Sequence, residues 1–182
     1  MEKNWTAAFR TRIDSLVIVL LASACSVQPY NEPATEDRAH LRLAVQNTSS
    51  DLVEAVVVPN GTCLNPLVSK YQSIAILGGP HPRQGKQGVR VGMPDGDAYA
   101  DRQLAEVYIP SGQKISLDFI VNGGNWHCHT PLSFIPEGAN DYEAIFTLQA
   151  RQCRVRLSRI TRIAASSYGW EPVHAQQLHI CQ

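Results

Sequence analysis

The sequence lacks three short motifs that often mark a catalytic centre: a Gly-x-Ser-x-Gly elbow, a His-Glu-x-x-His helix and a Cys-x-x-Cys pair. It also lacks an excess of charge, because 16 Lys and Arg residues balance 16 Asp and Glu residues. Without a net positive field the protein has little non-specific attraction for phosphates, so we expect no nucleic acid partner. No internal repeat occurs, and the 182 residues fit one globular domain once any processed segment is removed.

The N-terminus has the order of features found in export signals. Basic residues Lys3, Arg10 and Arg12 precede an apolar run at residues 16–22, and small residues then lead to Cys25. The apolar run is shorter than the roughly 20 residues that a helix needs to cross a bilayer. The pattern therefore predicts a signal helix within residues 1–24 that is removed from the mature protein.

The segment Leu21-Ala22-Ser23-Ala24-Cys25 resembles the lipobox of bacterial lipoprotein signals. It departs from the usual lipobox at Ala22, where the family most often has leucine. The resemblance implies that the peptide is cut before Cys25 and that this cysteine carries acyl chains such as palmitate. By the same resemblance, Ser26 in place of aspartate implies sorting to the outer membrane. We therefore expect a protein held by its N-terminal lipid at the periplasmic face of the outer membrane.

The polar segment after the signal predicts a tether. Residues 25–38 contain Pro29 and Pro33 among polar residues and show no hydrophobic periodicity. We expect the lipidated cysteine and a flexible tether over residues 25–38. Residues 39–182 then form a single domain with a C-terminal tail.

The domain contains short segments of strand type separated by turn residues. The candidate strands are residues 41–46, 53–58, 73–77, 88–91, 105–109, 114–121, 126–135, 142–148 and 153–160. Turn residues between the first two predict a hairpin. Only the tail, residues 162–182, is expected to hold a helical turn.

Close strand spacing without a helical period predicts an all-β fold, an antiparallel β-sandwich of Ig-like or transthyretin-like architecture. Alternating apolar residues then mark the inner faces of the sheets. The expected core residues are Ile115, Leu117, Phe119, Ala144, Phe146, Leu148, Val155 and Leu157.

The cysteines predict a disulfide-braced domain. Of five cysteines, four remain after lipidation of Cys25. An even number in an exported domain indicates two disulfides, for which three connectivities exist. We favour Cys128 with Cys153, which bracket one strand-turn-strand unit and would tie neighbouring strands. Cys63 would then hold the tail through Cys181.

Two sets of residues are candidate metal ligands. His127 and His129 flank Cys128, and residues two apart on a strand share a face. Hard cations such as calcium prefer carboxylate oxygens. A single loop supplies three of these: Asp95, Asp97 and Asp101. Neither set has the full spacing of a known metal motif, so surface histidines beside a disulfide and a solvated acidic loop are the favoured interpretations. We expect no cofactor.

Arginines on the last strand are candidate ligand-binding residues. Arg154 and Arg156 alternate with apolar residues, and together with the nearby Arg151, Arg159 and Arg162 they could form a basic stripe able to hold phosphates or sugar acids. A charged outer or edge face that resists aggregation is the favoured interpretation. Trp126 would supply a platform for a ligand, or else part of the core.

The sequence favours a non-enzymatic lipoprotein that acts as a binding or assembly component of the cell envelope, with an envelope protein as its expected partner. The alternative is a periplasmic protein that binds a small molecule or a metal. The least favoured hypothesis is an envelope hydrolase whose base would be a histidine such as His81, His174 or His179.

Overall fold

The computed structural model describes residues 28–46, 51–58, 63–64, 71–79 and 86–180. Within those ranges the chain forms β-strands and two 3-10 turns, η2 (Gly96–Ala98) and η3 (Asp101–Gln103), with no α-helix. None of these residues belongs to a helix with the length and hydropathy needed to span a bilayer. The predicted signal helix and Cys25 lie outside the described residues. The all-β prediction is confirmed.

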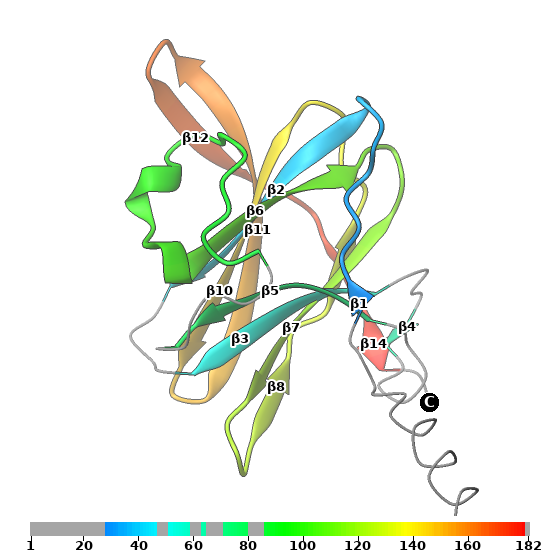
Figure 1. Cartoon of the computed structure of the whole chain (residues 1–182), viewed down its shortest axis with the longest axis vertical. Coiled ribbons are helices and arrows are strands. Elements are labelled where there is room, and N and C mark those ends of the chain that lie inside the picture. Colours follow the sequence, from blue (N-terminus) through cyan, green and yellow to red (C-terminus); the bar gives the residue numbers. More distant parts are fainter. Residues whose placement is uncertain (1–27, 47–50, 59–62, 65–70, 80–85, 181–182) are drawn as a thin grey trace, which may run out of the picture.

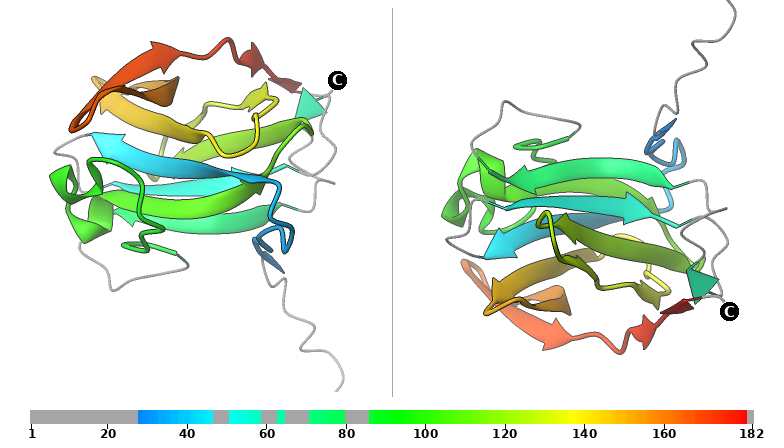
Figure 2. Two further views of the ribbon diagram at one scale, coloured as in Figure 1. Left: turned by 90° about the horizontal axis from the view of Figure 1, so that it is seen from above. Right: turned by 90° about the horizontal axis from the view of Figure 1, so that it is seen from below.

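Two large sheets form the body of the molecule in a sandwich-like arrangement, as Figures 1 and 2 show. The larger sheet has the order β1 (Gln28–Pro29), β5 (Gln72–Gly78), β3 (Leu52–Val57), β7 (Ile115–Asn122), β9 (Leu132–Phe134) and β13 (Gln176–Gln177), with β8 (His127–His129) also pairing with β7. The smaller sheet has the order β12 (Ser167–Pro172), β11 (Gln152–Ala164), β10 (Asp141–Gln149), β2 (Arg38–Gln46) and β6 (Leu104–Pro110). A two-stranded sheet joins β14 (His179–Ile180) to β4 (Cys63–Leu64).

Both large sheets are mixed, so the prediction of a wholly antiparallel sandwich is wrong. Strand β2 runs parallel to β10, and β1 runs parallel to β5. The other pairs within the two large sheets are antiparallel. Side-chain alternation is the same in either direction, so the hydrophobic pattern carries no information about strand direction.

The hairpin predicted from residues 41–46 and 53–58 is also wrong. Both segments are strands, but β2 belongs to the five-stranded sheet and β3 to the seven-stranded sheet. Turn residues predict that the chain reverses, yet they do not determine whether the next strand pairs beside the first or crosses to the facing sheet. The segment between them therefore connects the two layers.

The predicted core is confirmed. One apolar cluster between the sheets contains all eight expected residues, of which Leu148 and Val155 are partly buried at its margin. The rings of Phe119 and Phe146 stack with centroids 5.9 Å apart, one from each sheet. Burying side chains of this size contributes roughly 1.5–3 kcal/mol each. This contact holds the two sheets face to face.

Four segments differ from their predicted conformation, among them residues 126–135, which form two short strands, β8 and β9, in place of one. Part of the predicted tether is docked, because β1 pairs with β5 and Tyr30 is buried with its hydroxyl donating to the Tyr108 carbonyl. The segment is anchored by the single aromatic ring of Tyr30, and one buried residue produces no hydrophobic periodicity in the sequence. Residues 88–91 form no strand, and the described tail forms strands β12, β13 and β14 instead of a helical turn.

The disulfide between Cys128 and Cys153 is present, with the Cα atoms 6.5 Å apart. It joins β8 of one sheet to β11 of the other, so it ties the two layers and not neighbouring strands of one sheet. Cys63 is also disulfide-bonded, whereas Cys181 lies outside the described residues. The pairing of β14 with β4 sets His179 opposite Cys63. Pairing of Cys63 with Cys181 therefore stays a prediction that this register favours.

Candidate functional site

An open cleft of about 650 Å³ lies where the edges of the two sheets meet. Residues 129–132 of the β8–β9 segment form one wall and residues 153–157 of β11 form the other. The C-terminal tail supplies residues 172–175 and Gln177 as it passes from the five-stranded to the seven-stranded sheet. Figure 2 shows this tail following one side of the molecule. The cleft is therefore bounded by both sheets and by the strand crossing between them.

The polar groups of the cleft are basic or neutral. The cleft is lined by Arg154, Arg156, His129 and His174, and no described residue of its lining is acidic. Neither arginine forms an ion pair within the described part of the chain. Leu132, Leu157 and other apolar residues form the floor. The arrangement suits a ligand that carries negative charge and some apolar surface.

The alternation of β11 explains how the two arginines come to flank the cleft. Val155 and Leu157 pack toward the core cluster, so the residues between them point to the outer face. Both Arg154 and Arg156 are exposed there. Arg159 follows the other parity and pairs with Glu137 and Glu171, so it does not extend the predicted basic stripe. Of the arginines in the predicted stripe, Arg154 and Arg156 line the cleft, and Arg151, Arg159 and Arg162 do not.

A buried carboxylate orients one of the cleft histidines. His129 Nδ1 lies 2.7 Å from Oδ2 of Asp118, whose side chain is fully buried. Burial raises the pKa of the Asp118 carboxyl, although the hydrogen bond from His129 acts in the opposite direction. An ionised carboxylate requires a proton on Nδ1, which leaves Nε2 of a neutral ring with its lone pair. The second carboxylate oxygen, Oδ1, is buried without a hydrogen-bond partner in the described structure.

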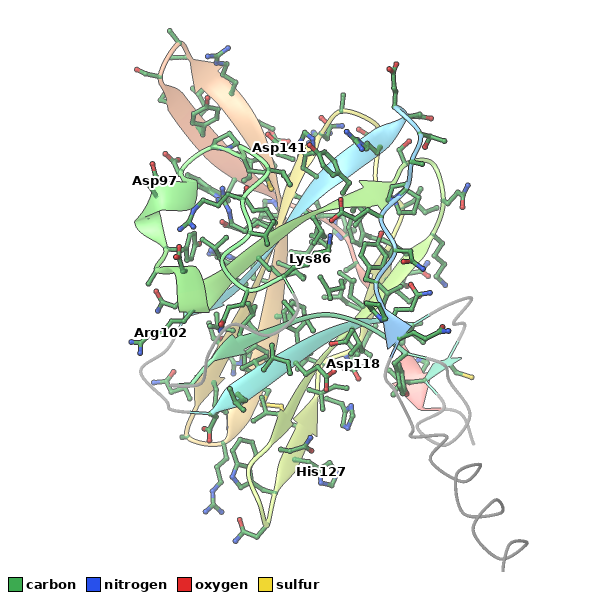
Figure 3. All side chains as sticks on the ribbon, in the orientation of Figure 1. Lys86, Asp97, Arg102, Asp118, His127 and Asp141 are labelled. Atoms are coloured by element: carbon green, nitrogen blue, oxygen red, sulfur yellow. A yellow bond between two sulfur atoms is a disulfide. The ribbon has the colours of Figure 1, made fainter. Side chains whose placement is uncertain are left out.

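The predicted metal ligands fall into two separate regions. His127 and His129 lie on β8 with ring centroids 6.0 Å apart. Figure 3 places His127 and Asp118 near each other and far from Asp97. Asp97 is exposed on η2.

The acidic loop does not gather its carboxylates around one point. Asp101 pairs with Arg90 at 2.6 Å, while Asp95 precedes η2 with a left-handed backbone. Across the ranges that the structure describes, no group of three or more His, Cys, Asp or Glu side chains is placed to hold a metal. Metal binding by either set stays a prediction.

Trp126 belongs to the core margin and not to the arginine face. It packs against the apolar cluster beside Cys128. Its indole also lies against Gly123, where a Cβ atom would approach within 2.1 Å of Nε1. The close contact explains why glycine stands at this position of the β7–β8 turn. The residue thus shapes the turn, and its role as a ligand platform stays a prediction.

A buried ion-pair network on the five-stranded sheet was not predicted. Arg42 is fully buried between two acids that the strand register places on either side of it, Glu106 and Glu143. Its guanidinium lies 2.8 Å from Glu106 Oε1 and 3.0 Å from Glu143 Oε1. The Tyr99 hydroxyl donates to Glu143 Oε1 at 3.1 Å, and burial raises the pKa of Tyr99 to about 12. The phenol therefore keeps its proton and remains a donor.

The network holds the loop that contains η2 and η3 against the sheet. Backbone N–H groups of Val91 and Met93 donate to Glu106 Oε2, at 2.7 and 3.3 Å. Arg42 also donates to the Pro94 carbonyl. Because the carboxylates and Arg42 bind backbone groups of the loop and the Tyr99 hydroxyl, this network fixes the position of the loop.

Sequence reasoning missed this network because Arg42, Glu106 and Glu143 are spaced far apart and only strand order makes them neighbours. It missed the Asp118–His129 pair for the same reason, although alternation alone places Asp118 off the apolar face of its strand. His174 lines the cleft, His179 begins β14, and His81 lies outside the described residues.

Compared with known proteins, the chain matched no protein-family model, no curated protein and no solved structure.

Proposed function

We propose that the protein is a non-enzymatic binding component of the cell envelope that holds an anionic ligand in the cleft between its two sheets. The observation that carries this proposal is the pair of exposed arginines, Arg154 and Arg156, in a cleft where the structure describes no acidic lining residue. Arginine donors that are not already neutralised form charge-assisted hydrogen bonds with phosphates and carboxylates. The apolar floor adds contact area.

The disulfide supports this proposal because it limits movement of the cleft walls. Cys153 lines the cleft and bonds to Cys128 in the facing sheet. A site whose walls are covalently joined loses less conformational entropy when it binds a ligand. We propose that the finer architecture is an Ig-like or transthyretin-like sandwich, in which such cross-sheet disulfides brace the layers.

The proposed address comes from the sequence. We propose that Cys25 carries the lipid and that the domain faces the periplasm from the outer membrane, with an envelope protein as partner. The N-terminal order of basic, apolar and small residues supports export. An oxidising compartment also suits a disulfide that joins two sheets. The intact mass of membrane-extracted protein tests the address, because a free Met1 and unmodified Cys25 would contradict it.

The binding proposal is tested by calorimetric titration with inorganic pyrophosphate. We expect Arg154→Ala combined with Arg156→Ala to weaken binding at least about tenfold, since two charge-assisted hydrogen bonds are lost. Arg162→Ala is the matched control, because Arg162 is an exposed arginine of the same strand that does not line the cleft. Equal affinity in the double variant and the wild type would contradict the proposal.

A second candidate function, metal binding at His127 and His129, rests on the hydrogen bond from His129 to Asp118. Metal-bound histidines commonly donate their other ring nitrogen to a carboxylate, which fixes the ring orientation. Asp118 holds His129 in this way, and the His127 ring lies 6.0 Å from it. Water or a second molecule would complete such a two-histidine site.

Titration with zinc or copper separates the two candidates. Metal binding predicts heat and a raised melting temperature in the wild type, and a loss of affinity of about 10–100-fold in Asp118→Asn. Asp97→Asn is the control because that exposed carboxylate lies far from the histidines. Absence of heat and of any melting shift would exclude the metal candidate.

A further inference from the structure

The hydrogen bonding of β11 shows which of its peptide groups face the cleft. The Val173 N–H donates to the Leu157 carbonyl at 3.1 Å, so the backbone groups of Leu157 point away from β10. In an antiparallel ladder these directions alternate with a period of two residues. The N–H and C=O groups of Val155 and Cys153 therefore also point away from β10, toward the cleft. Those of Arg154 and Arg156 bond to β10.

This edge of β11 has no partner strand within the described residues. Strand β12 pairs with β11 only from Ser158 to Ala164, and the tail bonds it last at Leu157. The edge from residue 153 to residue 156 is left open, a length of about 13 Å. Cys153, Arg154, Val155 and Arg156 all line the cleft, so the open edge forms its wall.

The facing edge is open in the same sense. The Thr130 N–H donates to the Phe119 carbonyl, and the Gly123 N–H donates to the Trp126 carbonyl. By alternation the peptide groups of His127 and His129 point away from β7. His129 lines the cleft opposite β11. Peptide groups without a partner among the described residues therefore border the cleft on two sides.

We propose that the ligand of the cleft is an extended acidic segment of another protein, which adds to β11 as a further strand beside residues 153–156. This inference rests on the proposed function and names the chemical class of its ligand. An open edge is a template for an added strand, in which backbone hydrogen bonds supply affinity and alternate side chains supply specificity. The free peptide groups of Val155 and Cys153 form those hydrogen bonds.

The side chains around the edge determine the sequence pattern of the segment. Arg154 and Arg156 lie on the outer face, where an added strand would present every second side chain. Acidic residues at these positions neutralise the two arginines. The intervening residues face Val155 and Leu132 on the inner side, where β-branched residues fit. The expected ligand thus alternates acidic and β-branched residues over about five positions.

The test uses the full chain purified from membranes and the peptide acetyl-Glu-Val-Glu-Val-Glu-amide as probe, with inorganic pyrophosphate as a non-peptide anion. The informative variant is Val155→Pro. It removes the N–H that faces the cleft and leaves the ladder to β10 intact, because proline is tolerated where the missing N–H faces away from the sheet. We expect Val155→Pro to weaken peptide binding at least about tenfold and to weaken pyrophosphate binding much less, because the lost N–H serves strand addition and the arginine side chains remain.

A second measurement keeps the test valid if Val155→Pro does not fold. In the wild type, the peptide is expected to slow hydrogen exchange at the Val155 amide, and pyrophosphate is not. Equal peptide affinity in Val155→Pro and the wild type, or no slowing of exchange at Val155, would overturn the strand addition. If pyrophosphate binds and the peptide does not, only this inference fails. If neither binds, the proposed function fails as well.

Discussion

Arginines occupy two regions on the outer face of the same sheet, and their environments are opposite. Arg42 on β2 is fully buried, contacts two carboxylates and donates to a loop carbonyl. Arg154 and Arg156 on β11 are exposed and form no ion pair within the described ranges. The charge of Arg42 is neutralised by ion pairs, whereas the charges of Arg154 and Arg156 have no ion-pair partner among the described residues.

The two arginine regions differ because the neighbouring strands supply different residues and because a loop covers only one of the regions. Strand register places Glu106 and Glu143 beside Arg42, whereas Arg156 stands opposite Ile145 and Arg154 stands opposite Thr147. The loop with η2 and η3 then covers the Arg42 region through the Glu106 carboxylate. A residue type thus has a structural or a binding role according to what the adjacent strands and loops supply.

The largest effect on stability is expected when the buried Arg42 network is broken. Arg42→Met should lower the free energy of unfolding by about 3–5 kcal/mol, because it leaves two carboxylates buried without a cation. Urea unfolding measures this loss. The control Arg154→Met should change stability by no more than about 0.5 kcal/mol. A loss below about 1 kcal/mol in Arg42→Met would mean that the network does not stabilise the loop.

The stability of the cleft region should depend on the Cys128–Cys153 disulfide. Replacing Cys128 and Cys153 with alanine should lower the free energy of unfolding by about 2–4 kcal/mol, because the disulfide restricts the unfolded chain. Thermal unfolding under non-reducing conditions measures this effect. We also expect weaker pyrophosphate binding in this variant, since the cleft walls are no longer joined. Unchanged stability and affinity would show that packing alone positions the walls.

Sequence patterns correctly predicted features that are set within a single strand, such as which side chains face the core. Alternation identified the inward residues of β7, β10 and β11, and Cys128 and Cys153 were paired correctly. Strand order was not predicted, and the antiparallel prediction was wrong for the β2–β10 and β1–β5 pairs, because parallel and antiparallel strands show the same alternation.

The same limit applies to the candidate site. Arg154 and Arg156 were candidate ligand-binding residues because they alternate with apolar residues on one strand, although a charged outer face was the favoured interpretation. The buried network and the Asp118–His129 pair need residues from several strands, and only the folded register brings them together. Composition gave no indication that one arginine is buried and two are exposed.

A third prediction concerns the two exposed arginines, Arg154 and Arg156. Combining Arg154→Ala with Arg156→Ala should leave the melting temperature unchanged while the affinity for pyrophosphate falls about tenfold, or about 1.4 kcal/mol. Stability stays constant because neither arginine has an ion-pair partner within the described residues. A large fall in melting temperature would assign these arginines a structural role like that of Arg42.

The smallest effect is expected at Asp118, a buried acid that lacks a guanidinium partner. Burial raises its pKa in the folded protein. The folded state therefore holds the proton more tightly than the unfolded state does, and stability falls as pH rises from about 4 through the raised pKa. Asp118→Asn should remove this part of the pH dependence, as urea unfolding at several pH values would show. Asp97→Asn should retain the wild-type profile, and coinciding profiles for Asp118→Asn and the wild type would refute the prediction.

The proposed function depends most on where an anion binds. Amide chemical shifts measured during a pyrophosphate titration of the wild-type protein report this directly. We predict saturable shifts for Arg154, Val155 and Arg156 and for the facing residue His129, with little change at Arg42. Shifts that centre on the loop around η2, or that scatter over the surface without saturation, would contradict the assignment of the cleft as the binding site.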